Sequence, residues 1–229
     1  MASNYINYNV DLVFCIDATM SMYRILDKVK ENALHFYEDL TKAMQEKGKR
    51  VDSLRARVVA FRDYIADEEP MLVTDFFNLP EQSEEFSACI KSIAPYGGGD
   101  DPEDALEALA YAIRSKWNKA PGAMNREVIV LWTDAEPHPL GFGRQSPRYP
   151  KGMPKDLGEL SEWWGAPGVP GYMDERGKRI LIYAPDAPAW DQILQSWNCS
   201  MMYPSEAGEG LKEHDYNEII HAIAESISF

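Results

Sequence analysis

The sequence predicts an α/β fold, namely a doubly wound, mostly parallel six-stranded sheet with helices on both faces. Apolar runs without alternation, such as Leu12–Ile16 and Glu127–Trp132, are typical of central strands that helices cover on both sides. Amphipathic helical patterns separate most of these runs, as in βαβ units. The 229 residues suit one domain, and the 45% hydrophobic and 26% charged residues are typical of a globular chain.

The first half of the chain shows three strands and a long helix. Leu12–Ile16 is the first strand, and it runs into a polar turn. Apolar residues spaced by three and four then predict a helix over Met22–Lys47, with Gly48 as its stop. Leu54–Phe61 and Met71–Phe77 are the next two strands. The connection between them is too short for a crossover helix, so we expect an antiparallel hairpin at the sheet edge.

The second half continues the alternation of strands and helices. We expect helices at Glu81–Ile93, Pro102 to about Trp117, Asp156–Trp164, Ala189–Trp197 and His214–Ile227, and strands at Glu127–Trp132, Arg179–Ala184 and Ser200–Tyr203. Two stretches, Ala135–Lys155 and Gly165–Gly177, are rich in turn residues and show no period. The sequence therefore predicts one domain over residues 1–229 with a loop-rich insert at about 135–178, and long loops of this kind are often functional.

The net charge and the cysteine content indicate which classes of partner and which cellular compartment to expect. The net charge of −14, from 37 acidic and 23 basic residues, disfavours nucleic acid and anionic membranes as partners. The amino terminus lacks a basic segment before an apolar run, and no apolar stretch reaches membrane length, so we expect neither signal peptide nor membrane span. Cys15, Cys89 and Cys199 are odd in number and far apart, which favours a reducing cytoplasm without disulfides.

The turn after the first strand carries the first candidate site. Asp17, Thr19 and Ser21 alternate with apolar residues at the carboxyl end of that strand, which is where open α/β sheets bind ligands. One carboxylate and two hydroxyls are hard oxygen ligands that suit Mg²⁺ or Mn²⁺. Residues of these types are also common helix N-caps without any metal, and the three positions alone leave both readings open.

Two further polar segments favour the metal reading. Asp134 follows the strand Glu127–Trp132, as Asp17 follows the first strand. If these strands are neighbours where the strand order reverses, both carboxylates face one crevice. Between them, the segment Tyr96–Asp104 holds three consecutive glycines, which allow positive φ and a close backbone approach to a ligand.

In this order, the motifs resemble the metal-ion-dependent adhesion site of von Willebrand factor A (vWA) domains. Asp17-x-Thr19-x-Ser21 is similar to the usual Asp-x-Ser-x-Ser, with threonine in the middle position. The glycine-rich turn ends in Asp100-x-Pro102-Glu103, which is similar to the Asp-x-Pro-Glu of many vWA domains. Thr133-Asp134-Ala135 matches the third loop, Thr-Asp-Gly, without its glycine, and Arg62-Asp63 also resembles the family. The resemblance spans residues 11 to 135 and implies a vWA/Rossmann-like fold.

The resemblance also implies a ligand set for Mg²⁺, Mn²⁺ or Ca²⁺. Ser21 and Thr19 would bind the ion directly, and Asp17 and Asp134 would bind it or hold waters that do. Much of the family has a threonine in the second loop, so here Asp100 or Glu103 would take that place. We favour Glu103, because integrin β subunits use the glutamate at this position.

A second cation near Asp63, Asp100, Glu103 and the Pro102 carbonyl would also follow the integrin pattern. In the alternative, Asp63 pairs with Arg62 or caps a turn. His138, four residues after Asp134, is either a base or ligand at the site or a loop histidine without a role.

The function that the resemblance implies is metal-dependent protein binding without catalysis, in an intracellular multiprotein assembly. The ion keeps one position open, and a partner protein donates a carboxylate to it. A Mg²⁺-dependent hydrolase acting on phosphate esters is a second hypothesis, although the sequence offers no evident base or phosphate cradle. A scaffold that has lost its metal is a third, since Thr19, Ala135 and the missing second-loop threonine depart from the family pattern.

Overall fold

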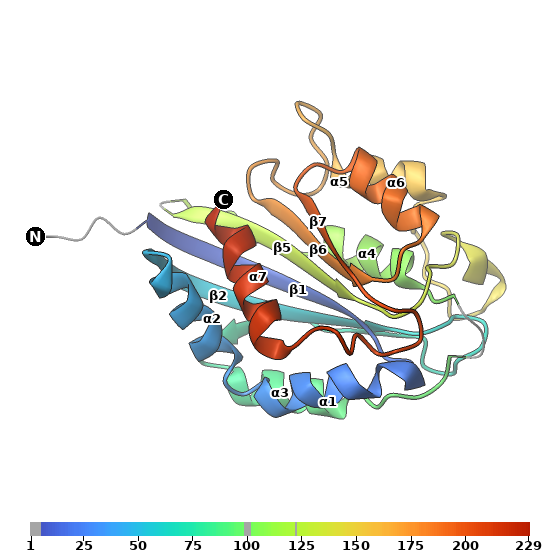
Figure 1. The fold of residues 1–229 in the computed structure, drawn as a ribbon. Helices are drawn as coiled ribbons and strands as arrows, with labels where there is room; N and C mark the ends of the chain where they lie inside the picture. Colours follow the sequence, from blue (N-terminus) through green and yellow to red (C-terminus); the bar gives the residue numbers. More distant parts are fainter. Residues whose placement is uncertain (1–5, 99–101, 122) are drawn as a thin grey trace, which may run out of the picture.

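In the computed structural model, which describes residues 6–98, 102–121 and 123–229, seven strands form one sheet (Figure 1). Their bounds are β1 Ile6–Asp17, β2 Lys49–Phe61, β3 Met71–Val73, β4 Phe77–Leu79, β5 Met124–Trp132, β6 Lys178–Ala184 and β7 Ser200–Pro204. The order is β3-β2-β1-β5-β6-β7, and β4 also pairs with β2. All neighbours are parallel except β3 and β4, which run antiparallel to β2. The predicted mostly parallel sheet with an antiparallel edge is confirmed, but the single strand expected over Met71–Phe77 is split in two.

Helices cover both faces of this sheet, as predicted (Figure 1). Side chains of α1, α2, α3 and α7 fill one hydrophobic core, and side chains of α4, α5 and α6 fill the other. The bounds are α1 Tyr23–Asn32, α2 Phe36–Glu46, α3 Ser83–Ser92, α4 Ala105–Ile113, α5 Leu157–Trp164, α6 Pro188–Ser196 and α7 Tyr216–Ser228.

Strand β1 explains why its sequence shows no alternation. Leu12 and Phe14 point into the core under α1 and α2, whereas Val13 and Cys15 point into the core under α4. All four are buried, because a central strand of a two-sided sheet must be apolar on both faces. The strand therefore places its final residue, Asp17, rigidly at the carboxyl edge of the sheet.

Strand order reverses between β1 and β5, which lie side by side at the centre of the sheet. From β1 the chain builds outward through β2 and β3, and from β5 it builds outward on the other side through β6 and β7. Asp17 ends β1 and Asp134 follows β5. The two carboxylates predicted to share one crevice thus stand at the switch point of the sheet, where α/β proteins bind ligands.

The long helix predicted over Met22–Lys47 is wrong in one respect, because it is two helices. A short 3₁₀ turn, Met20–Met22, leads into α1, and a turn around Ala33 separates α1 from α2. The side-chain amide (Nδ2) of Asn32, the last residue of α1, donates a hydrogen bond back to the Lys28 carbonyl (2.8 Å). Both helices bury the same apolar stripe, so the spacing of apolar residues continues across the break and does not reveal it.

The insert after β5 packs beside α4 and the loop that follows β2. Apart from a 3₁₀ turn, Phe142–Gln145, the described part before α5 is irregular, as expected. Glu107 of α4 accepts hydrogen bonds from the Gly141 amide and the Tyr149 hydroxyl, both at 2.8 Å. Tyr149 also packs edge-on against Tyr64, with 5.1 Å between ring centroids. The insert is therefore fixed next to the carboxyl edge of the sheet.

No helix in the described ranges has both the length and the apolar character that a membrane crossing requires.

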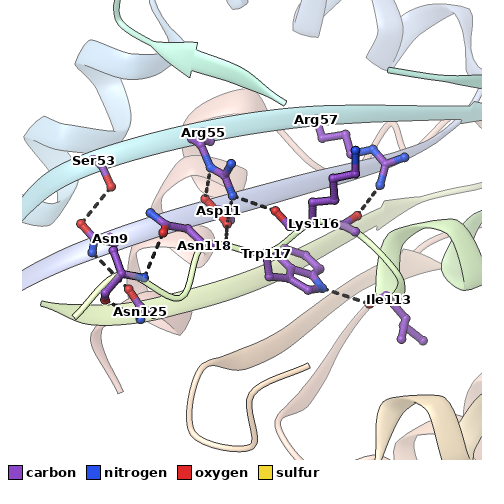
Figure 2. Close-up of polar contacts among 12 residues, drawn as sticks. Asn9, Asp11, Ser53, Arg55, Arg57, Ile113, Lys116, Trp117, Asn118 and Asn125 are labelled. Atoms are coloured by element: carbon purple, nitrogen blue, oxygen red, sulfur yellow. Dashed lines mark hydrogen bonds and ion pairs between the residues drawn. The ribbon is translucent and has the colours of Figure 1, made fainter. Parts of the chain in front are cut away.

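A buried ion pair fixes the segment after α4 to the sheet (Figure 2). Arg55 of β2 donates two hydrogen bonds to Asp11 of β1, at 2.8 and 2.6 Å, and one to the Lys116 carbonyl at 3.0 Å. The Asn118 amide donates to the second Asp11 oxygen at 2.6 Å. The Asp11 side chain is 2% exposed, so these donors replace the water that the carboxylate lost on folding.

We expect Asp11→Ala to lower the free energy of unfolding by about 2–4 kcal/mol, because Arg55 and the Asn118 amide lose their acceptor. Asp52→Ala is the matched control, since the Arg50–Asp52 pair lies on the surface and should contribute less than about 1 kcal/mol. Urea unfolding of both variants measures the difference. Equal costs at the two positions would contradict a structural role for Asp11.

Candidate metal centre

Asp17 is fully buried and accepts three hydrogen bonds. Its Oδ1 accepts from the Thr19 amide (2.9 Å) and the Thr19 hydroxyl (2.6 Å), and its Oδ2 accepts from the Thr133 hydroxyl (2.7 Å). Burial raises the pKa of Asp17 to about 6, although the bonds from Thr19 and Thr133 oppose the rise. The carboxylate is held in one orientation by the loops that follow β1 and β5.

Two hydroxyls lie side by side between Asp17 and Asp134 at the switch point, and each donates to one of the two carboxylates. Thr19 Oγ1 lies 3.3 Å from Ser21 Oγ, and Ser21 Oγ donates to Asp134 Oδ1 at 2.8 Å. Four of the seven predicted site residues, Asp17, Thr19, Ser21 and Asp134, are therefore brought together. Their oxygens are of the kind that Mg²⁺ prefers.

The loop between β7 and α7 completes this side of the site, and sequence reasoning did not find it. The Gly208 amide donates to the Asp134 carbonyl (2.8 Å), and the Gly210 amide donates to Asp134 Oδ2 (2.7 Å). A Cβ on Gly210 would lie 2.5 Å from the Ser21 carbonyl oxygen, so only glycine permits this approach. The signal in the sequence was the pair of glycines in Ala207–Leu211, but they carry no motif and lie far from the other site residues.

Glu103 is a buried carboxyl group with an unsatisfied oxygen. Its backbone is tied to the segment after β5, through its amide to the Glu136 carbonyl (3.0 Å) and through its carbonyl to the His138 amide (2.8 Å). The side chain is 3% exposed, and among the described residues Oε2 has no hydrogen-bond partner. Burial and, next, the charge of Asp17 and of Asp63 raise the pKa of Glu103 to about 10.

Gly98 lets Glu103 and Thr19 approach one another. Its φ of +79° is in the left-handed region, and a Cβ there would lie 3.2 Å from both Glu103 Oε1 and Thr19 Cβ. Among the described residues of the second loop, Glu103 is thus the one that we place facing the group Asp17, Thr19, Ser21 and Asp134. Asp100, the alternative for that place, lies outside the described residues.

Asp63 is engaged by its own loop and by the insert. Its Oδ1 accepts from the Ile65 amide and from the Ala66 amide (2.8 Å), which is a turn cap. Its Oδ2 lies 2.8 Å from Nε2 of His138, whose ring stacks on Phe142 at 4.0 Å. His138 therefore has a structural partner in the site, and Asp63 takes the turn-capping role that the sequence left as an alternative.

Arg62, next to Asp63, does not form the ion pair that the sequence suggested as an alternative. Its buried guanidinium donates to the carbonyls of Ala18 (3.0 Å), Tyr96 (3.1 Å), Glu69 (2.9 Å) and Ala94 (2.7 Å). These carbonyls belong to the loop after β1, the loop after β2 and the segment between α3 and α4. Arg62 therefore fixes these three segments relative to one another.

Within the described residues, no three histidine, cysteine, aspartate or glutamate side chains are grouped closely enough to hold a metal ion. The oxygens gathered at the switch point are of mixed type, two carboxylates and two hydroxyls, with the Glu103 carboxyl beside them. Such a set has few charged ligands, so any ion bound there would keep water or a partner's atom in part of its coordination shell.

The sequence model for the von Willebrand factor A domain matches residues 11–139. No curated protein sequence matches the chain. Among solved structures, a von Willebrand factor type A protein from Catenulispora acidiphila aligns over 94% of the chain, with 15% identity and a TM-score of 0.51. The pilus adhesin SpaC of Lactobacillus rhamnosus GG, in its open conformation, aligns over 96%, with 14% identity and a TM-score of 0.52. The chain spans only 42% and 30% of the lengths of these two proteins, which share its fold.

We expect the metal-free protein to lose stability as the pH rises from 5 to 8. The folded pKa of Glu103, about 10, lies above its ordinary value of 4.5, so the folded state binds the proton more tightly. This contribution is fully present below about pH 4.5 and is lost as the pH rises toward 10. The loss is at most about 1.4 kcal/mol per pH unit.

Urea unfolding at pH 5 and pH 8 measures this effect. Glu103→Gln cannot ionise, so its stability should fall less across the interval than that of the wild type. Glu85→Gln, on the exposed side of α3, is the matched control and should follow the wild type. Parallel pH profiles of stability for the wild type and Glu103→Gln would contradict a raised pKa of Glu103 in the folded state.

Proposed function

This chain belongs to the von Willebrand factor A domain family, and on that premise we propose that it is a metal-ion-dependent protein-binding module. The proposed binding face is the carboxyl edge of the sheet around Asp17, Ser21 and Asp134. A divalent cation, Mg²⁺ or Mn²⁺, is held there and offers an open coordination position to a carboxylate of the partner protein.

The observation that supports this proposal is the cluster of four oxygen-bearing side chains, Asp17, Thr19, Ser21 and Asp134, in which each hydroxyl donates to one carboxylate. Two strands deliver hard oxygen atoms to one place, and the nearby Glu103 Oε2 is buried without a partner among the described residues. Burial and, next, the charges of Asp17 and Asp63 raise the pKa of Glu103, and a cation beside these groups would favour its ionised form. The donor set therefore fits a hard divalent ion.

We assign the ligand roles as follows. Ser21 and Thr19 bind the ion through their hydroxyls, and Asp17 and Asp134 bind it or orient its waters. Glu103 is the acidic group of the second loop. Asp63 supports the site through His138, because its two oxygens already accept hydrogen bonds.

Exposed apolar side chains beside the site residues favour a protein as the partner. Met20, Ile65 and Phe142 are 56%, 43% and 46% exposed, and they neighbour Ser21, Asp63 and the His138 ring respectively. Apolar anchors around a polar centre are typical of protein interfaces. The three cysteines are free thiols, which supports the reducing, intracellular setting expected from the sequence.

Calorimetric titration of EDTA-stripped protein with Mg²⁺ and Mn²⁺ tests the metal. We expect saturable binding, weakened by about tenfold or more in Asp17→Ala/Ser21→Ala, because the site loses one carboxylate and one hydroxyl. Asp191→Ala/Ser196→Ala removes the same residue types from the exposed side of α6 and should bind as the wild type does. Absence of binding by the wild type would favour a scaffold without metal.

Sodium acetate is a minimal probe of the open position. In Mg²⁺, we expect Glu103→Thr to bind acetate more tightly than the wild type, because removing a carboxylate from the ion's surroundings makes the ion more electrophilic. Titration of acetate followed by NMR chemical shifts measures this, with the same titration in EDTA as the control. Equal affinities in the two proteins, with metal still bound, would exclude Glu103 from the site.

A further inference from the structure

The outer edge of β3 presents unpaired backbone groups. The Arg62 amide donates to the Pro70 carbonyl (2.8 Å), and the Thr74 amide donates to the Val58 carbonyl (3.0 Å). Because bonded pairs alternate along an antiparallel ladder, Leu72 is the residue of β3 that bonds to β2. The amides and carbonyls of Met71 and Val73 therefore point outward, and within the described residues they meet no partner.

A groove of about 760 Å³ runs along this edge. Tyr111 of α4 and Arg148 of the insert line one side, and Ser92 and Ile93, at the end of α3, line the other. The two helices lie on opposite faces of the sheet (Figure 1), so the residues that line the groove come from both sides of β3. The volume is within the range of roughly 300–1,000 Å³ that ligand sites occupy.

Strand β3 lacks one of the features that usually keep a sheet edge from pairing, a charged side chain within the strand. Its sequence, Met71-Leu72-Val73, has no charge, and Leu72 is 40% exposed. Edge strands are commonly protected by lysine or by inward-pointing charges. Here only the shortness of the strand and the preceding Pro70 limit what can pair with it.

We propose that this groove, the edge groove, binds an extended segment of a partner protein that adds to the sheet beside β3. The backbone of the segment pairs with the outward groups of Met71 and Val73. Successive side chains of a strand point to opposite faces, so those of the bound segment contact the α4 side and the α3 side of the groove alternately. The edge groove is a second interaction surface, separate from the metal centre.

Charge complementarity defines the segment further. The charge along the groove is mixed: Glu68 and Glu69 line its end just before β3, and Arg148 lines the side of α4. Arg148 is exposed, and no hydrogen bond or ion pair engages its guanidinium within the described residues. Toward α3 the exposed apolar side chain is that of Leu72, and Ile93 beside it is only 3% exposed. The segment therefore carries an acidic residue on the side that faces α4 and apolar residues on the side that faces α3.

A phage-displayed library of random dodecapeptides is the probe, selected on the full chain in EDTA so that the metal centre does not contribute. Hydrogen exchange of the complex with the selected peptide is then followed by NMR. We expect the amides of Met71 and Val73 to exchange at least about tenfold more slowly in the complex. The Leu72 amide, already bonded to β2, should not change.

Val73→Pro and Val73→Ala form a matched pair of variants. Proline removes the outward amide of Val73 without breaking a bond to β2, whereas alanine keeps that amide and loses a comparable side chain. We expect peptide affinity to fall about tenfold more in the proline variant than in the alanine variant. Selection on Arg148→Glu should replace the acidic residue of the enriched peptides with a basic one.

The proposal is overturned if no peptide is enriched, or if enriched peptides leave the exchange of Met71 and Val73 unchanged. Equal affinities of Val73→Pro and Val73→Ala would also overturn it. If the proline variant does not fold, the exchange pattern of the wild type decides alone. Peptide selection and binding are done in EDTA, so a negative result here does not contradict the proposed metal-dependent function. Likewise, a failure to bind metal does not contradict the proposed role of the edge groove.

Discussion

The rest of the structure depends on the burial of several carboxylates at the carboxyl edge of one sheet. Asp17, Asp63, Glu103 and Asp134 are each at most 3% exposed, and burying a charge is costly unless donors or counter-charges replace water. Asp17 receives hydroxyls, Asp63 receives a histidine, and Asp134 receives the amide of Gly210. Of these four, only Glu103 keeps a buried oxygen without a donor among the described residues, and the cation that we propose would supply the missing partner.

The buried guanidinium of Arg62 holds backbone segments together and does not neutralise the nearby carboxylates. It donates to four backbone carbonyls instead. Arginine suits this role because its planar fork donates in several fixed directions. The loops are therefore held in place, and none of these four bonds from Arg62 goes to a site carboxylate.

The parts of the site that the sequence predicted are those carried by local pattern. An apolar strand followed by an acidic turn is visible at Asp17 and at Asp134, and the parallel sheet brings the two together. Gly210 could not be predicted, because its contact with Ser21 depends on where a loop nearly two hundred residues later returns to the site. The partner of Asp63, His138, depended likewise on the path of an irregular insert. The break between α1 and α2 was hidden because both helices bury one continuous stripe.

The candidate metal centre and the edge groove share Arg62. Its guanidinium donates to the Ala18 carbonyl in the loop after β1, stacks over the Tyr96 ring at 3.9 Å, and lines the groove. A variant that lacks the Arg62 side chain would therefore disturb both surfaces at once, so it could not distinguish the function of one from that of the other. Ser21 touches only the metal centre, whereas the outward amide of Val73 belongs only to the edge. Each of these two groups can be removed while the four carbonyl bonds of Arg62 stay intact, and this makes the two surfaces experimentally independent.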